Sequence, residues 1–232
     1  MFGANPIRKQ ELRPDGRLWV QEIFRTIQGE GPRAGQPSVF IRLAGCNLAC
    51  RFCDTEFEQG HWMLPRDVVD TARNLQPTSS REIPLYVITG GEPFRQDIRV
   101  LLDQLFVLHS VVQIETAGTL WLEGLDWRTE IVVSPKTGTI RSEIAARAMA
   151  WKYIIRAGEL SDEDGLPNIN TQTGVQQILA RRGDNIRAPI YVQPCDDHDP
   201  VKNTANLAAA KESALKFGYR LSLQQHKLLE LP

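Results

Sequence analysis

The sequence lacks any long apolar run. In this sequence of 232 residues, the first residues contain no apolar run of signal-peptide length. No later segment approaches the roughly 20 apolar residues that span a bilayer. The sequence also lacks an excess of charge of either sign. The formal net charge is −1, which gives no electrostatic reason to expect nucleic acid or a membrane surface as a partner. With no repeat or composition break, we expect a single domain over residues 1–232, located in the cytoplasm, with no nucleic acid and no membrane as partner.

Cysteine is scarce and unevenly distributed. Of four cysteines, Cys46, Cys50 and Cys53 lie within eight residues, whereas Cys195 stands alone far downstream. Three thiols this close have poor disulfide geometry, and a reducing compartment disfavours disulfides in any case. Clustered cysteines in such a chain indicate metal or redox chemistry.

Short β-rich runs alternate with helical patterns along the chain. The predicted strands cover residues 39–43, 85–89, 111–115, 131–134, 152–155, 190–193 and 219–223. Apolar residues at helical spacing predict two helix faces, one formed by Ile98, Leu101, Leu102 and Leu105 and the other by Leu207, Ala210, Ala214 and Phe217. The alternation predicts an α/β fold with a mainly parallel sheet and right-handed crossovers, and leaves open whether that sheet closes into a barrel.

Polar or glycine-rich segments follow most of the predicted strands. In parallel α/β folds, ligands bind at the carboxyl ends of the strands, so a shared rim of chemical groups is the simplest explanation. The segments are Gly45-Cys46, Thr89-Gly90-Gly91-Glu92, Glu115-Thr116, Ser134-Pro135-Lys136 and Gln193-Pro194.

The clustered cysteines favour an iron–sulfur cluster over zinc. A structural zinc site normally takes four protein ligands, and either His61 or Cys195 would have to supply the fourth. A [4Fe–4S] cubane bound by three cysteines leaves one iron open to a non-protein ligand. The amino and carboxylate groups of S-adenosylmethionine can chelate that iron, and an electron from the cluster then breaks the sulfonium carbon–sulfur bond to give a 5′-deoxyadenosyl radical.

The spacing Cys-x-x-x-Cys-x-x-Cys after a strand, with Phe52 before the last cysteine, resembles the signature of the radical S-adenosylmethionine superfamily. The segment Gly90-Gly91-Glu92-Pro93 resembles a second superfamily motif, in which glycines let the backbone approach a ligand. The resemblance implies an incomplete parallel β/α barrel. It further implies that S-adenosylmethionine contacts Phe52, Gly90, Gly91 and Glu92, with Glu92 accepting a hydrogen bond from the methionine amino group.

Two further strand ends suit the same cofactor. Ser134 and Lys136 share one motif, and Thr116 lies in another; their hydroxyl and amino groups could contact the ribose or the carboxylate. The alternative for each hydroxyl is a helix cap or a turn hydrogen bond.

The motifs outside the cysteine loop narrow the resemblance. They occur in one order from about Glu22 to the C-terminus, and residues 1–20 and 157–173 match none of them. They resemble the 7-carboxy-7-deazaguanine synthases of queuosine and deazapurine biosynthesis. These enzymes convert 6-carboxy-5,6,7,8-tetrahydropterin into 7-carboxy-7-deazaguanine with loss of ammonia. The motifs are Gln28-Gly29-Glu30-Gly31, Phe40-Ile41-Arg42-Leu43, Cys53-Asp54-Thr55, Ile114-Glu115-Thr116, Ser134-Pro135-Lys136, Val192-Gln193-Pro194 and Gln225-His226-Lys227.

A pterin substrate suits several of these residues. Its flat polar ring has amide and amino edges, and it carries a carboxylate that an arginine can bind in a bidentate fork. Arg42 is the candidate for the carboxylate, although an interstrand ion pair is its alternative role. The candidates for the ring are Gln28, Gly29, Glu30, Thr89, Glu115, Gln193 and His226.

The resemblance also implies a magnesium ion that positions the substrate. Mg²⁺ prefers oxygen donors and shares its shell with substrate and water. Thr55 is the implied protein ligand, although it could instead help Asp54 cap the cysteine loop. The chain ends soon after His226, so the carboxylate of Pro232 is a further substrate-binding candidate.

The resemblance implies a homodimer that receives electrons from a flavodoxin-like or ferredoxin-like protein. Two rival functions stay open at this point. A glycyl-radical activating enzyme shares the cysteine spacing but acts on a partner protein, which leaves the Gln28 and His226 motifs without a role. A zinc-binding module that uses His61 is a rival that would not be an enzyme.

Overall fold

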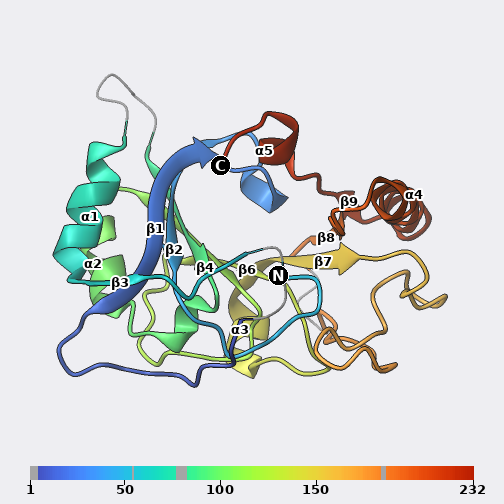
Figure 1. Cartoon of the computed structure of the whole chain (residues 1–232), viewed down its shortest axis with the longest axis horizontal. Coiled ribbons are helices and arrows are strands. Elements are labelled where there is room, and N and C mark those ends of the chain that lie inside the picture. Colours follow the sequence, from blue (N-terminus) through green and yellow to red (C-terminus); the bar gives the residue numbers. More distant parts are fainter. Residues whose placement is uncertain (1–4, 54, 77–82, 184–186) are drawn as a thin grey trace.

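A computed structural model describes residues 5–53, 55–76, 83–183 and 187–232 (Figure 1). These residues form one nine-stranded open sheet in the order β3-β1-β2-β4-β5-β6-β7-β8-β9. The strands are β1 (Leu18–Ile27), β2 (Pro37–Leu43), β3 (His61–Met63), β4 (Leu85–Gly90), β5 (Val111–Thr116), β6 (Glu130–Val133), β7 (Ala148–Ile155), β8 (Ile190–Pro194) and β9 (Arg220–Leu221).

The parallel part of the sheet follows the prediction. Neighbouring strands from β2 through β9 pair in parallel, and the sheet does not close, so the incomplete parallel barrel is confirmed. The pattern missed β1 and β3, which add to the β2 edge as antiparallel strands. A register shift between Val20 and Glu22 explains the first omission, because one extra residue breaks the alternation of apolar and polar positions along β1.

The helices are α1 (Pro65–Asn74), α2 (Arg99–Val107), α3 (Ser142–Arg147), α4 (Pro200–Phe217) and the short α5 (Gln225–Leu228), with 3₁₀ turns η1 (Gly31–Arg33) and η2 (Pro93–Arg95). In Figure 1, α1 and α2 lie side by side at one end of the sheet and α4 lies near β8. Among the described residues, no helix combines the length and the apolar character needed to cross a membrane.

One of the two predicted helix faces is right and the other is partly wrong. Ile98 and the three leucines of α2 are buried as expected. On α4, however, Leu207 is 44% exposed. The buried positions there are Asn206, Ala210 and Ser213, because the polar side chains hydrogen-bond to the backbone carbonyls of Cys195 and Gly165. A face held by small and polar residues has no apolar periodicity to detect.

The central strands use their two faces differently. Alternate residues such as Ile88, Ile114 and Tyr153 join the main core under the helices, whereas Val132, Ala150 and Tyr191 form a small separate cluster on the opposite face. We call that opposite side the cavity face. Because side chains alternate along a strand, the polar residues at the strand ends share this face, and they are Arg42, Thr89, Glu115, Lys152 and Gln193.

The side of β4 that packs under the helices allows a prediction of stability. Ile88 is fully buried in the main core, so Ile88→Ala should lower the free energy of unfolding by about 2–5 kcal/mol. The control Val107→Ala removes a side chain that is 76% exposed and should change it by less than about 0.5 kcal/mol. Denaturant unfolding measures both, and equal losses would contradict the assignment of Ile88 to the core.

Candidate functional site

Two adjoining cavities lie over the carboxyl ends of the strands. The cysteine cavity is lined by the cysteine loop and by the ends of β4 through β8, and the C-terminal cavity is lined by β1, β2 and the last residues of the chain. The two cavities share the lining residues Glu30, Thr55, Thr89, Glu115, Lys152 and Gln224. They therefore form one continuous site with two halves, as the rim of motifs predicted.

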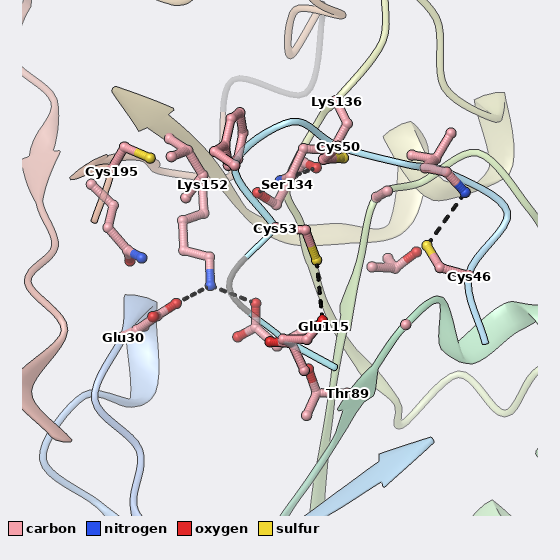
Figure 2. A pocket seen from close by; sticks show the side chains of 18 of the residues that line it. Glu30, Cys46, Cys50, Cys53, Thr89, Glu115, Ser134, Lys136, Lys152 and Cys195 are labelled. Atoms are coloured by element: carbon pink, nitrogen blue, oxygen red, sulfur yellow. Dashed lines mark hydrogen bonds and ion pairs between the residues drawn. The ribbon is translucent and has the colours of Figure 1, made fainter. Parts of the chain in front are cut away.

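Cys46, Cys50 and Cys53 all line the cysteine cavity (Figure 2). Burial raises the pKa of the Cys46 thiol to about 12, and the nearby Glu92 carboxylate adds to this effect. Among the described residues, no three His, Cys, Asp or Glu side chains form a ready site for a single metal ion. In a cubane, each cysteine binds a different iron. Three sulfurs that face one cavity therefore fit a cluster without meeting at one point.

The glycines of the β4 end are required by a close backbone approach. A Cβ atom on Gly91 would lie 2.0 Å from the carbonyl oxygen of Gly45, and one on Gly90, whose φ is +128°, would lie 2.0 Å from that of Leu43. Both glycines line the cysteine cavity. The structure adds that they also let β4 pack directly against the start of the cysteine loop.

Glu92 lies beside the cavity but does not line it. It is fully buried, and its carboxylate accepts hydrogen bonds from the Thr116 hydroxyl at 2.8 Å and from the Ala117 and Phe94 backbone N–H groups at 2.9 and 3.1 Å. Burial raises the pKa of Glu92. In this arrangement Glu92 fixes the turns that follow β4 and β5, and Thr116, Phe52 and Gly90 form part of the cavity wall.

Ser134 and Lys136, both predicted to contact the cofactor, line the cysteine cavity. The Lys136 ammonium donates to the Ser134 carbonyl at 3.0 Å and also contacts its hydroxyl. Burial lowers the pKa of Lys136, and the nearby Cys50 thiol opposes that shift. The ammonium thus lies close to the cysteine loop, where it can contact an anionic group of a cofactor.

A buried lysine links two of the predicted substrate residues. Lys152 on β7 places its Nζ atom 2.5 Å from a Glu30 oxygen and 2.8 Å from a Glu115 oxygen (Figure 2). Gln224 and Gln113 donate to the remaining oxygens of these carboxylates at 2.9 and 2.7 Å.

Lys152, Glu30 and Glu115 form a buried triad, and these charged groups shift one another's pKa values. Burial alone would raise the pKa of Glu30, but Lys152 outweighs it and lowers the pKa to about 2. For Glu115, burial dominates and raises the pKa. The two carboxylates outweigh burial at Lys152 and raise its pKa. Lys152 belongs to no motif, although a single charge inside the apolar run Ala-Met-Ala-Trp-Lys-Tyr-Ile-Ile is a usable signal for a functional residue.

The C-terminal cavity contains a buried donor that lacks a partner. Gln28 is 2% exposed, and its Oε1 atom accepts from the Glu30 backbone N–H at 3.1 Å. Its Nε2 atom has no hydrogen-bond partner among the described residues. A buried unpaired donor costs about 1–3 kcal/mol. A ligand with an acceptor atom would satisfy it.

The C-terminal segment closes this cavity. A Cβ atom on Gly29 would lie 2.2 Å from Nδ1 of His226, so the glycine allows α5 to pack against this turn. The Thr26 hydroxyl donates to the Pro232 carbonyl at 2.9 Å, which holds the chain end at the cavity wall. Both His226 and Pro232 therefore line this cavity, and Figure 1 shows the C-terminus beside the end of β1.

Arg42 and Thr55 adjoin each other in the C-terminal cavity. Arg42 Nε lies 2.7 Å from a Glu22 oxygen, so the interstrand ion pair foreseen as its alternative role does form. Its Nη1 atom also donates to the Thr55 hydroxyl at 3.3 Å. Asp54, which could cap the cysteine loop together with Thr55, lies outside the described residues. Gln193 lines the cysteine cavity and accepts from the Ser222 hydroxyl at 3.1 Å.

Two segments without a motif contact the cysteine loop. The Arg8 backbone N–H donates to the Cys46 carbonyl at 2.7 Å, and the Asn5 amide donates to the Thr55 carbonyl at 2.9 Å. From the other side, Thr171 and Gln172 contact the loop near Cys50. No local pattern could have identified these residues, because their partners lie 38 or more positions away in the sequence.

His61 and Cys195, the two candidates for a fourth zinc ligand, lie in different places relative to the cysteine loop. His61 lies in β3 at the edge of the sheet and is not part of the cavity lining. Cys195 is buried and lines the cysteine cavity from the end of β8 (Figure 2).

Known proteins resemble the whole chain. No protein-family model matches it. The 7-carboxy-7-deazaguanine synthase of Rhodospirillum rubrum is 44% identical over the full length of both chains. That of Rickettsia prowazekii is 42% identical over 99% of this chain and 95% of its own. The crystal structure of QueE from Escherichia coli superposes with a TM-score of 0.66 at 25% identity, over 90% of this chain and 94% of that one.

The triad supplies a prediction with a defined pH dependence. Lys152→Met leaves Glu30 and Glu115 buried without a cation, so burial should raise both pKa values above the unfolded value of about 4.3. Carboxyl groups with raised folded pKa values stabilise the fold below the unfolded pKa, and this stability is lost as pH rises through the folded values. The variant should therefore lose about 3–5 kcal/mol at pH 7 and less at pH 4.5.

Denaturant unfolding at the two pH values measures this loss. The control is Lys211→Met, which removes an exposed lysine of α4 and should change stability little at either pH. A loss for Lys152→Met that is the same at both pH values would show that the carboxylates do not depend on Lys152.

Proposed function

The chain belongs to the family of 7-carboxy-7-deazaguanine synthases, and we propose that its two adjoining cavities divide this reaction between them. The enzyme is a radical S-adenosylmethionine lyase. The cysteine cavity holds the cluster and S-adenosylmethionine, and the C-terminal cavity holds 6-carboxy-5,6,7,8-tetrahydropterin. The observation that carries this assignment is the cysteine loop, which faces a cavity continuous with the one that contains Gln28, whose Nε2 atom has no partner among the described residues.

Cys46, Cys50 and Cys53 hold a [4Fe–4S] cluster in this proposal. Their support is the donor set, three thiols on one loop that line a single cavity. When bound, the reduced cluster and S-adenosylmethionine supply a carbon-centred radical that removes a hydrogen atom from the substrate. Phe52, Gly90, Gly91, Thr116, Ser134 and Lys136 form the cofactor wall, and Glu92 supports that wall from behind.

The substrate-binding residues act by orientation and by exclusion of water. Gln28 Nε2 donates to an acceptor on the pterin ring, and Glu30 and Glu115 face its amino edge. Lys152 keeps its proton between the two carboxylates and so holds them in place. Thr89 and His226 line the same cavity, Gly29 supports His226, and Gln193 faces the ring from the cysteine cavity. No protein nucleophile takes part.

Arg42, Thr55 and Pro232 lie where the substrate carboxylate would be. Arg42 already pairs with Glu22, so its guanidinium is held in position on one side. Thr55 offers one hydroxyl oxygen as a Mg²⁺ ligand, and the substrate and water supply the other donors, as is common for Mg²⁺. The Pro232 end is held near this point by Thr26.

The proposal includes the setting of the enzyme. The chain acts as one domain in a homodimer, and a flavodoxin-like or ferredoxin-like protein delivers the electron. A cluster and its electron donor require a reducing compartment, which supports a cytoplasmic location. The continuous small-molecule site also favours this function over activation of a glycyl-radical partner protein.

A product assay tests the function directly. The protein, reconstituted anaerobically with iron and sulfide and supplied with reductant, S-adenosylmethionine, Mg²⁺ and 6-carboxytetrahydropterin, should form 7-carboxy-7-deazaguanine detectable by mass. Cys50→Ala should abolish the product, because a cluster ligand is lost. Deoxyadenosine formed without the product would leave the radical chemistry intact and reject the pterin as substrate.

Gln28 tests the position of the substrate. Gln28→Leu removes the unpaired donor, so the KM for 6-carboxytetrahydropterin should rise about tenfold. Cleavage of S-adenosylmethionine in the absence of substrate should be unaffected, since Gln28 does not line the cysteine cavity. The matched control is Gln21→Leu, on β1, the strand that ends just before Gln28, and outside both cavities. An unchanged KM in Gln28→Leu would contradict this position of the pterin.

A further inference from the structure

A turn that no motif covers reaches the middle cysteine of the loop. It follows β7 and contains Thr171 and Gln172. The Arg51 backbone N–H donates to the Thr171 carbonyl at 3.0 Å, and the Ala49 backbone N–H donates to Gln172 Oε1. Between these two contacts, Gln172 Nε2 lies 3.0 Å from the sulfur of Cys50. The turn therefore binds the cysteine loop on both sides of one thiol.

The orientation of the Gln172 amide follows from its neighbours. The Ala49 N–H can only donate, so the oxygen of the amide must face it. The NH₂ group then faces Cys50 Sγ and the Thr171 hydroxyl, which lies 2.7 Å from Nε2. The Thr171 hydroxyl can in turn donate to the Lys136 carbonyl at 2.9 Å. Each amide hydrogen thus has its own acceptor.

The turn itself is rigid. Asn170 Oδ1 accepts from the backbone N–H groups of Gln172 and Thr173 at 2.8 and 3.1 Å. Thr171 is 4% exposed, and Gly174 packs close to the Arg51 guanidinium, which a Cβ atom would approach to 3.0 Å. Gln172 therefore reaches Cys50 from an ordered support, and the contact needs little further ordering.

We infer that Gln172 is a positioning residue for the cluster, which donates an N–H···S hydrogen bond to the Cys50 thiolate and makes the cluster easier to reduce. This inference rests on the proposed function, because it requires a cluster on Cys50. A hydrogen bond to a charged acceptor is stronger than one to a neutral acceptor. The reduced cluster carries one more negative charge than the oxidised cluster, so the N–H group stabilises the reduced form more. Hydrogen bonds to the sulfurs are among the features that set cluster potentials.

The reduction potential of the reconstituted holoenzyme tests this inference. Gln172→Leu removes the donor and retains the bulk, so the ratio of reduced to oxidised cluster at a fixed potential should fall about three- to tenfold. A tenfold fall corresponds to a midpoint about 59 mV more negative for one electron. Gln172→Glu keeps the shape but replaces the donor by an acceptor, so its midpoint should shift in the same direction by at least as much. A redox titration followed by electron paramagnetic resonance gives both values.

The matched control is Gln176→Leu. Gln176 is exposed on the same segment and should leave the midpoint unchanged. The midpoint belongs to each assembled cluster, so it can be measured even where a variant assembles less of it. Unchanged midpoints in both Gln172 variants would overturn the inference and leave the proposed function standing.

Two other outcomes are equally informative. Loss of the cluster in both Gln172 variants, with the unmodified protein loaded, would also overturn the inference, since Gln172 would then hold the loop without tuning the potential. Failure of the unmodified protein to assemble any cluster would overturn the proposed function itself.

Discussion

Each central strand of this sheet must bury both of its faces, and the site depends on how the second face is used. On the helix face, residues such as Ile88 and Tyr153 form the main core. On the cavity face, Val132, Ala150 and Tyr191 form a small apolar cluster, and polar residues occupy the carboxyl ends of the strands. Because the alternation has a period of two, a shift of one residue in register would exchange core and site. The packing that stabilises the fold therefore also fixes which side chains face the ligand.

The cysteine loop depends on this sheet through several tight contacts. Gly90 and Gly91 bring β4 against the start of the loop, where a Cβ atom would meet carbonyl oxygens at 2.0 Å. The residues near Arg8 and Gln172 bind the loop from two further directions. Each of these contacts uses backbone groups of the loop. A loop of three metal ligands gains little stability from its own side chains before the cluster binds, so its shape has to come from neighbouring segments.

Several charged groups at the site are paired within the protein before a ligand binds. Lys152 balances two buried carboxylates, which would otherwise be unfavourable away from water. The Glu92 carboxylate accepts hydrogen bonds from the end of β5 and from the turn that follows it. The Nε2 atom of Gln28, which has no hydrogen-bond partner in the described part of the chain, is the group that most clearly requires a ligand. The site is thus largely preorganised, and binding needs few side chains to move.

The sequence alone determined the parallel strands, the polar rim and the cysteine loop, because alternation, strand-end motifs and cysteine spacing are local patterns. It also located Glu30, Glu115 and His226, whose motifs are contiguous in the chain. Tertiary structure decided what depends on distant partners. Three contacts join segments far apart in sequence. Glu92 accepts a hydrogen bond from Thr116, Lys152 bridges two carboxylates, and Gln172 reaches Cys50. The physical reason is that a hydrogen bond depends on the distance between two atoms in space, and no periodicity in the sequence encodes the distance between segments that only the folded sheet brings together.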